Sequence, residues 1–118
     1  MKITKTYTML VAQDMDRGVA FYRDVIGLKV GMQSPDWSEL EVADGAFVAL
    51  HGGGDGSPQP SSLGFDVDNV DGAITTLTAG GATLEWGPNR QDDEGIILAG
   101  LRDPEGNAFA ISQPIETR

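Results

Sequence analysis

The sequence predicts an α+β fold in which one βαβββ unit is used twice. Two stretches first indicate the repeat, residues 101–111 and a weaker copy at 44–50, because in each an acidic residue and a glycine lead into a strand. An alanine then stands four places after each glycine. A shift of 55 residues, which places Tyr7 on Ser62, also superposes the first strand and helix of the two halves.

The first strand and helix of the chain follow from the spacing of apolar side chains. Residues 3–12 alternate as in a strand that is at least partly covered on both faces. Asp14 is the expected N-cap of a helix, and Gly27 is its expected C-cap. One face of this helix is formed, at spacings of four, three and four, by Met15, Val19, Tyr22 and Ile26.

Three further strands complete the first half, at residues 28–33, 37–42 and 46–51. The Ser-Pro-Asp sequence at 34–36 and the Ala-Asp-Gly sequence at 43–45 provide the turns between them. A glycine- and proline-rich segment, residues 52–61, then reads as a linker.

The second half repeats this order. A strand at 62–67 precedes a helix at 70–79, which ends at a Gly-Gly pair. Pro104 and Gly106 form the last turn. The remaining segments are expected to be a strand at 83–87, a polar loop at 88–94, and strands at 95–102 and 108–113.

The chain is expected to be a single domain, 1–118, with a first module at 1–54, the linker at 52–61 and a second module at 62–118. A hydrophobic share of 40% with 22% charged residues is typical of a folded globule. A net charge of −10 argues against a nucleic-acid partner. The absence of cysteine, of a long apolar run and of a signal-peptide pattern predicts a cytoplasmic protein without membrane contact.

Two motifs carry a resemblance to a known family, the sequence FYRDVIGL at residues 21–28 and RDPEGN at residues 102–107. With the repeat, they resemble the glyoxalase/bleomycin-resistance/dioxygenase superfamily, also called vicinal oxygen chelate proteins. This resemblance implies that the two modules form a curled mixed sheet around a cleft, with the helices outside. It also implies a homodimer, since members commonly dimerise.

Metal-dependent members of the family hold a divalent cation with four side chains, typically His and Glu. Carried over one by one, those four positions fall here on Tyr7, Ala49, Ser62 and Ala110. Two alanines supply no ligand atom, and Tyr and Ser hydroxyls are poor substitutes. A different alignment of the fourth strand would bring in His51 alone. We therefore expect neither a metal nor another cofactor.

The expected ligand site combines strand alternation with these vacated positions. Its members are Tyr7, Met9, Trp37, Glu39, Glu41, Phe47, Ala49, His51, Ser62, Trp86 and Ala110. Four of them have an alternative interpretation: Glu39 and Glu41 also fit a solvated strand face, His51 a surface residue, and Trp86 core or rim packing. Tyr7, His51 and Glu41 are the only candidates for catalytic roles.

Three functions are compatible with the sequence. The favoured one is a metal-free binding protein that sequesters or carries an aromatic or cationic natural product or antibiotic, because a tryptophan and carboxylates share a strand face. The alternative is a metal-independent isomerase, lyase or hydrolase that uses the tyrosine, histidine or glutamate of the cleft. A metal-dependent lyase or dioxygenase is disfavoured by the four ligand positions.

Overall fold

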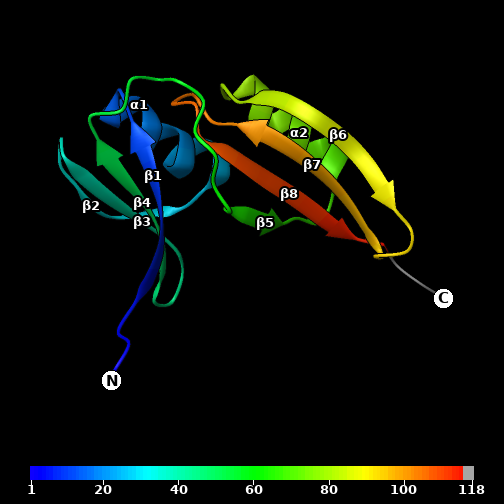
Figure 1. The fold of residues 1–118 in the computed structure, drawn as a ribbon, viewed down its shortest axis with the longest axis horizontal. Helices are drawn as coiled ribbons and strands as arrows, with labels where there is room; N and C mark the ends of the chain where they lie inside the picture. Colours follow the sequence, from blue (N-terminus) through cyan, green and yellow to red (C-terminus); the bar gives the residue numbers. More distant parts are fainter. Residues whose placement is uncertain (116–118) are drawn as a thin grey trace.

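A computed structural model describes residues 1–115 of the chain. The first module contains β1 (Thr6–Ala12), α1 (Met15–Ala20), η1 (Phe21–Ile26), β2 (Lys29–Gln33), β3 (Trp37–Ala43) and β4 (Ala46–Gly52). The second contains β5 (Gly64–Asp66), α2 (Val70–Ala79), β6 (Thr83–Gln91), β7 (Ile96–Arg102) and β8 (Ala108–Pro114). The βαβββ order therefore occurs twice, which confirms the predicted α+β fold (Figure 1).

Each module forms its own four-stranded mixed sheet. The strand orders are β1-β4-β3-β2 and β5-β8-β7-β6, so the first strand of each module lies at an edge. That strand pairs in parallel with the last strand of its module, and the other neighbours are antiparallel. The two registers correspond, since Met9 pairs with Ala49 as Gly64 pairs with Ala110. The two sheets remain separate and do not close into one.

The helices cover only one face of each sheet. The helix α1 contacts β3 and β4, whereas α2 contacts β6, β7 and β8 and also touches η1. Figure 1 shows α2 behind β6 and β7. The opposite face of each sheet carries none of the helices of residues 1–115, and we call it the open face of that module. No helix in this part of the chain is long and apolar enough to cross a bilayer.

The helix-facing side chains of both modules form one apolar core. Its fully buried members come from the strands and helices of each half, and burying them supplies the main driving force for folding. The largest are Tyr22, Leu40, Leu50, Leu101, Ile111, Val19, Val48 and Val70.

The turn before β8 connects the second module to the first through hydrogen bonds. Glu105 in this turn is fully buried, and its Oε1 accepts hydrogen bonds from the backbone N–H groups of Gln13 (2.9 Å) and Asp14 (2.7 Å). Its Oε2 accepts from Arg17 Nε at 2.5 Å. A buried carboxylate is stable only when it is paired and hydrogen-bonded in this way.

A second buried network extends this connection. Asp103 accepts hydrogen bonds from the Tyr22 hydroxyl (2.6 Å) and from the side chain and backbone N–H of Asn107. Asn107 also exchanges two hydrogen bonds with the backbone of Val11 in β1. Burial and the neighbouring Asp103 carboxylate hold the pKa of Tyr22 well above its usual value, so Tyr22 remains a hydrogen-bond donor.

Two predicted segments differ from the structure. The helix expected from Asp14 to Gly27 is α-helical only through α1 and continues as the π-helix η1, where the Gly27 N–H bonds to the Tyr22 carbonyl. Side chains spaced by three and four fit both helix types over so short a length. The prediction of a loop at 88–94 is wrong for residues 88–91, because β6 continues through Pro88 to Gln91, and is right for 92–94, which form the turn before β7. Proline is accommodated there since β6 is an edge strand.

The other boundaries moved by a few residues. The segment predicted as a strand at 62–67 pairs only over Gly64–Asp66, and the one at 3–12 pairs only from Thr6. The predicted N-cap Asp14 is confirmed, since it accepts from the Arg17 N–H. The structure adds Asn69 as the N-cap of α2, where it accepts from the Gly72 N–H. The bounds of α2 match the predicted 70–79.

Candidate functional site

The open face of the first sheet collects all of the first-module side chains that the sequence singled out. Residues directly opposite each other on paired strands point to the same face, and β1, β3 and β4 are paired in register. The group consists of Tyr7, Met9, Trp37, Glu39, Glu41, Phe47, Ala49 and His51. The alternate residues of the same strands, such as Leu10 and Leu40, are buried in the core.

Three rings form a row across this face. The Tyr7 and Trp37 ring centroids lie 5.6 Å apart with nearly perpendicular planes, and Trp37 and His51 repeat this geometry at 6.1 Å. Such edge-to-face contacts are favourable arrangements of aromatic rings. Tyr7 is nevertheless 50% exposed and the neighbouring Met9 is 57% exposed. The row therefore presents ring edges and faces to a ligand while its own geometry is fixed.

Glu39 is the best-ordered polar group on this face. Its two oxygens accept hydrogen bonds from Lys5 Nζ at 2.7 and 2.9 Å, and Oε2 also accepts from Trp37 Nε1 at 2.8 Å. Hydrogen bonds from Lys5 and Trp37 hold the pKa of Glu39 below its usual value, so the carboxylate stays ionised. The ammonium of Lys5 also lies 5.5 Å from the centroid of the Phe47 ring.

This pairing assigns different roles to the two glutamates. The charge of Glu39 is paired with Lys5, and the same carboxylate accepts a hydrogen bond from the Trp37 indole. Glu41 is half-buried and makes no side-chain hydrogen bond or ion pair within residues 1–115. His51 donates from Nδ1 to the Gly52 carbonyl at 2.6 Å, which leaves Nε2 directed away from this bond. Glu41, His51 and the hydroxyl of the half-exposed Tyr7 are therefore polar groups available to a ligand.

The open face of the second sheet is flat by comparison. Gly64 and Gly100 flank Ala110 on the neighbouring strands, so little side-chain volume stands above the backbone there. The indole of Trp86 lies over Gly100 so closely that a Cβ at this glycine would overlap it. Ser62 precedes β5 and is exposed. Both tryptophans of the chain consequently lie on open faces, one in each module.

Comparison with protein-family models shows which family the chain belongs to. A family model, the Glyoxalase/Bleomycin resistance protein/Dioxygenase superfamily, matches residues 6–111. The chain belongs to this superfamily. The resemblance predicted from the FYRDVIGL and RDPEGN motifs is thus confirmed.

Solved structures support the superfamily fold. A superfamily enzyme from Burkholderia phytofirmans PsJN aligns with 98% of this chain and 100% of its own, with a TM-score of 0.77 and 24% identity. A glyoxalase/dioxygenase from Nostoc punctiforme aligns over 98% and 92%, with a TM-score of 0.73 and 21% identity. An integron cassette protein from V. cholerae aligns over 96% and 97%, with a TM-score of 0.68 and 26% identity. No curated protein sequence matches the chain.

The structure places the four residues onto which the sequence resemblance carries the family's metal ligands on or beside the two open faces. Tyr7 and Ala49 lie on paired strands of the first open face, and Ala110 lies on the second, with Ser62 just before its edge strand. The methyl groups of the alanines have no donor atom, which leaves two hydroxyls where four N or O ligands are needed. Within residues 1–115, no three His, Cys, Asp or Glu side chains group as metal ligands.

Sequence reasoning missed one member of the site, Lys5. It lies two residues before Tyr7 and so shares the face of Tyr7 and Met9, a signal that strand alternation contains. Lys5 precedes the first paired residue of β1, and its exposed, terminal place in the sequence gave it no distinguishing feature. The structure shows that it completes the hydrogen bonding of Glu39.

Proposed function

We propose that this superfamily member binds an aromatic or cationic natural product, such as an antibiotic, on its open faces and carries or sequesters it without a metal ion. The observation that carries the proposal is the set of contacting rings of Tyr7, Trp37 and His51 on the first open face, where Tyr7 is half exposed. A ring or alkylammonium group stacked on such aromatic side chains gains roughly 1–2 kcal/mol when it is partly desolvated.

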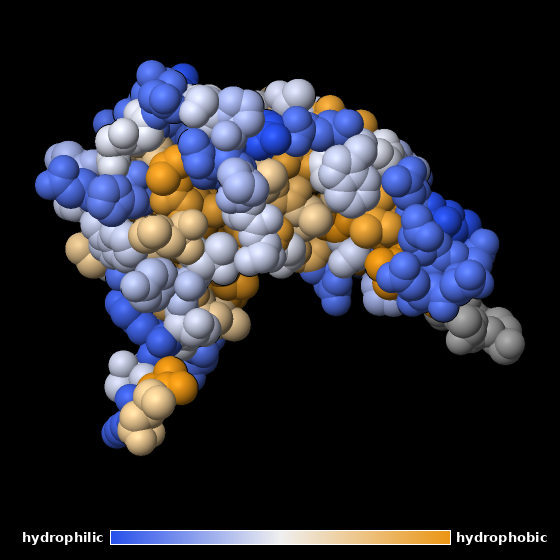
Figure 2. All heavy atoms as spheres, viewed as in Figure 1, coloured by the Kyte–Doolittle hydropathy of each residue, from blue (hydrophilic) through white to orange (hydrophobic). Residues whose placement is uncertain are grey.

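The surface chemistry supports this class of ligand. Figure 2 shows that apolar surface extends across the middle of the molecule, between hydrophilic surface at its two ends. Tyr7 and Met9 on the first open face, and Trp86 on the second, are exposed, and exposed large apolar side chains that gather on a surface commonly mark a binding site. The net charge of −10 and the carboxylate of Glu41 favour a positively charged group on the ligand.

A second copy of the chain would complete the site. The two sheets of one chain are separate, so each open face provides one wall only. We propose a two-fold symmetric dimer in which the aromatic face of one chain lies opposite the flat face of its partner, with the ligand between them. Sedimentation equilibrium at tens of micromolar is expected to give a dimer, and a monomer at this concentration would contradict this part of the proposal.

An enzymatic function is the second candidate because Tyr7 and His51 both contact the same indole, that of Trp37. A phenol and an imidazole close to one bound ligand could transfer protons to and from it. This alternative predicts turnover of the ligand by the wild-type protein and its loss in the double variant Tyr7→Phe, His51→Gln. The binding function predicts that the ligand is recovered unchanged.

The experiment is a thermal-shift screen of aromatic and cationic natural products, bleomycin among them, together with Zn²⁺, Ni²⁺, Mn²⁺ and Fe²⁺. A ligand present at a hundred times its Kd stabilises the protein by about 2.7 kcal/mol. Trp37→Ala is then expected to weaken binding of a hit roughly five- to thirtyfold. The proposal would be contradicted by stoichiometric metal that stays bound through dialysis. It would also be contradicted if neither Trp37→Ala nor Trp86→Ala changed the affinity for a hit.

A further inference from the structure

A hollow on the helix side of the molecule is separate from the open faces. It has a volume of about 610 Å³, within the range typical of small-molecule sites, and lies between η1 of the first module and α2 of the second. We call it the interhelical groove. Its apolar walls are formed by Val25, Ile26 and Leu28 on one side, and by Phe65, Val67 and Ala73 on the other.

Strand alternation shows that this groove is not part of the proposed ligand site. Phe65 and Ile111 pair across β5 and β8 and line the groove. Gly64 and Ala110, which alternate with them, point to the open face instead. Both tryptophans also lie on open faces, so neither reports directly on the groove.

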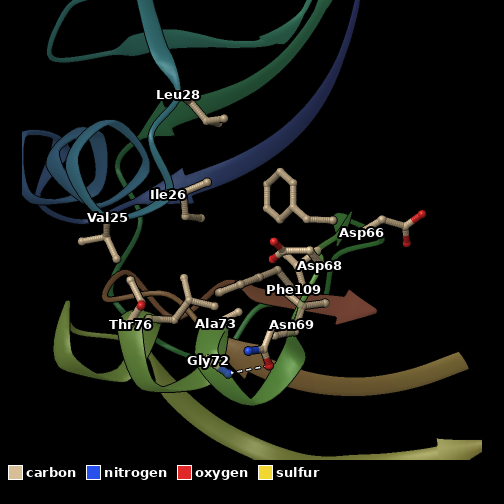
Figure 3. A pocket seen from close by; sticks show the side chains of 14 residues that line it. Val25, Ile26, Leu28, Asp66, Asp68, Asn69, Gly72, Ala73, Thr76 and Phe109 are labelled. Carbon is tan, nitrogen blue, oxygen red and sulfur yellow. Dashed lines mark hydrogen bonds between the residues drawn. The ribbon is translucent and has the colours of Figure 1, made fainter. Parts of the chain in front are cut away.

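One carboxylate gives the groove a charge preference. Figure 3 shows the Asp68 carboxylate turned toward the hollow, whereas that of Asp66 is turned away. Asp68 makes no ion pair or side-chain hydrogen bond within the described part of the chain. Asp66 accepts from Ser112 Oγ at 2.6 Å and remains at the rim. Among residues 1–115, no lysine or arginine lines the groove, so no basic side chain of its walls pairs with the exposed Asp68 carboxylate.

We propose that the interhelical groove is a second binding site, for a small molecule with an apolar body and one ammonium group. The body would pack between Val25, Ile26 and Ala73, and the ammonium would pair with Asp68. An apolar hollow with one carboxylate turned into it, that of Asp68, favours this shape over a neutral or anionic molecule, because only the cation gains a partner on binding.

Three naphthalene derivatives of the same shape test this proposal. The ¹⁵N-labelled protein is titrated with 2-naphthylmethylammonium, with neutral 2-naphthalenemethanol and with anionic 2-naphthylacetate. The amide resonances of Asp68, Ala73 and Thr76 are expected to shift saturably with the cation, with at least threefold weaker binding of the alcohol and weaker still of the anion. The indole N–H resonances of Trp37 and Trp86 report the open faces in the same spectra.

Two pairs of variants localise the effect. Asp68→Asn is expected to weaken binding of the cation three- to fivefold. Asp71→Asn removes one negative charge from the first turn of α2, outside the groove, and is expected to change the affinity less than twofold. Ala73→Leu fills the groove and is expected to weaken binding at least tenfold. Thr75→Leu adds the same side chain to an exposed position of α2 outside the groove and leaves binding unchanged.

Several results would overturn the proposal. They are equal affinity for the cation and the anion, an unchanged affinity in Asp68→Asn, or shifts confined to the indole N–H groups. A change of sedimentation behaviour in Ala73→Leu but not in Thr75→Leu would instead make the groove a contact between copies of the chain. The spectra of each variant show whether its fold is intact, so a loss of binding through unfolding is recognised.

Discussion

The two open faces occupy equivalent places in the repeat yet differ in nearly every side chain. In the first module, Ala49 lies between Met9 and Glu39 on the neighbouring strands. In the second, Ala110 lies between Gly64 and Gly100, with the Trp86 indole laid over the latter. The two modules therefore share the same backbone register but differ in the side chains on their open faces. One face carries fixed aromatic and polar groups, whereas the other offers a smooth surface.

The turns that precede the last strand of each module differ in the same way. Gly45 and Gly106 both adopt positive φ at corresponding places. Asp44, before the first of these glycines, is exposed, whereas Glu105, before the second, is buried against the first module. The comparison teaches that the second turn joins the modules and the first does not, although their sequences are related.

The largest expected effect is the loss of stability when the acidic residue of each turn is replaced by alanine. Glu105→Ala leaves the N–H groups of Gln13 and Asp14 and the Arg17 guanidinium without their acceptor, so the free energy of unfolding should fall by about 3 kcal/mol. The matched change at the other turn, Asp44→Ala, should cost less than about 0.5 kcal/mol. Urea denaturation of both variants measures this. Equal losses would mean that the turns are equivalent after all.

Phenylalanine in place of Ala49 or of Ala110 should affect stability and ligand affinity differently. Ala49→Phe crowds Met9 and the ordered Glu39, and is expected to cost about 2 kcal/mol of stability. Ala110→Phe has glycines on either side, so it should cost less than about 1 kcal/mol while weakening a ligand from the screen at least tenfold by filling the flat face. Denaturation and calorimetry of both variants test this. A folded Ala110→Phe protein with normal affinity would exclude the flat face as a ligand wall.

A smaller effect concerns the ordered carboxylate that only the first face possesses. The pKa of Glu39 is lowered in the fold, so its contribution to stability is present above the ordinary glutamate pKa of about 4.3 and is lost as pH falls through the lower native value. Wild type should exceed Glu39→Gln by about 1 kcal/mol at pH 7, and the difference should vanish near pH 3. Glu41→Gln is the control. A difference that persists in acid would mean that Glu39 acts through packing.

The smallest effect concerns the indole on the second face. Gly100→Ala places a Cβ where the Trp86 ring lies, and the exposed ring can move away at little cost. Stability should change by less than about 0.5 kcal/mol. Trp86 emission, read in a Trp37→Phe background, should shift to the red as the ring becomes more solvated. Unchanged emission would show that the indole does not rest on this glycine in solution.

Local patterns in the sequence predicted the repeat, the helix α2 and the Asp14 cap, because each depends on neighbours in the chain. They also placed Tyr7 and Trp37 on one face, since strand alternation needs no tertiary information. Local patterns failed at Pro88, because a proline is compatible with a strand only where that strand lies at a sheet edge, and the strand order is not visible in the sequence. They also could not pair Lys5 with Glu39 or locate the interhelical groove, because these contacts join segments that only the complete fold brings together.

The position of Glu105 has a consequence for how the chain is made. The helix α1 has six residues and continues as the six-residue η1, a length that is marginal for an isolated helix. The backbone N–H groups at its start, those of Gln13 and Asp14, bond to a carboxylate about ninety residues later in the chain. During synthesis, the first module therefore leaves the ribosome without the group that completes its helix start. Long-range contacts of this kind slow folding, since the chain must close a large loop before they form. The first half reaches its final state only after the last strands have been made.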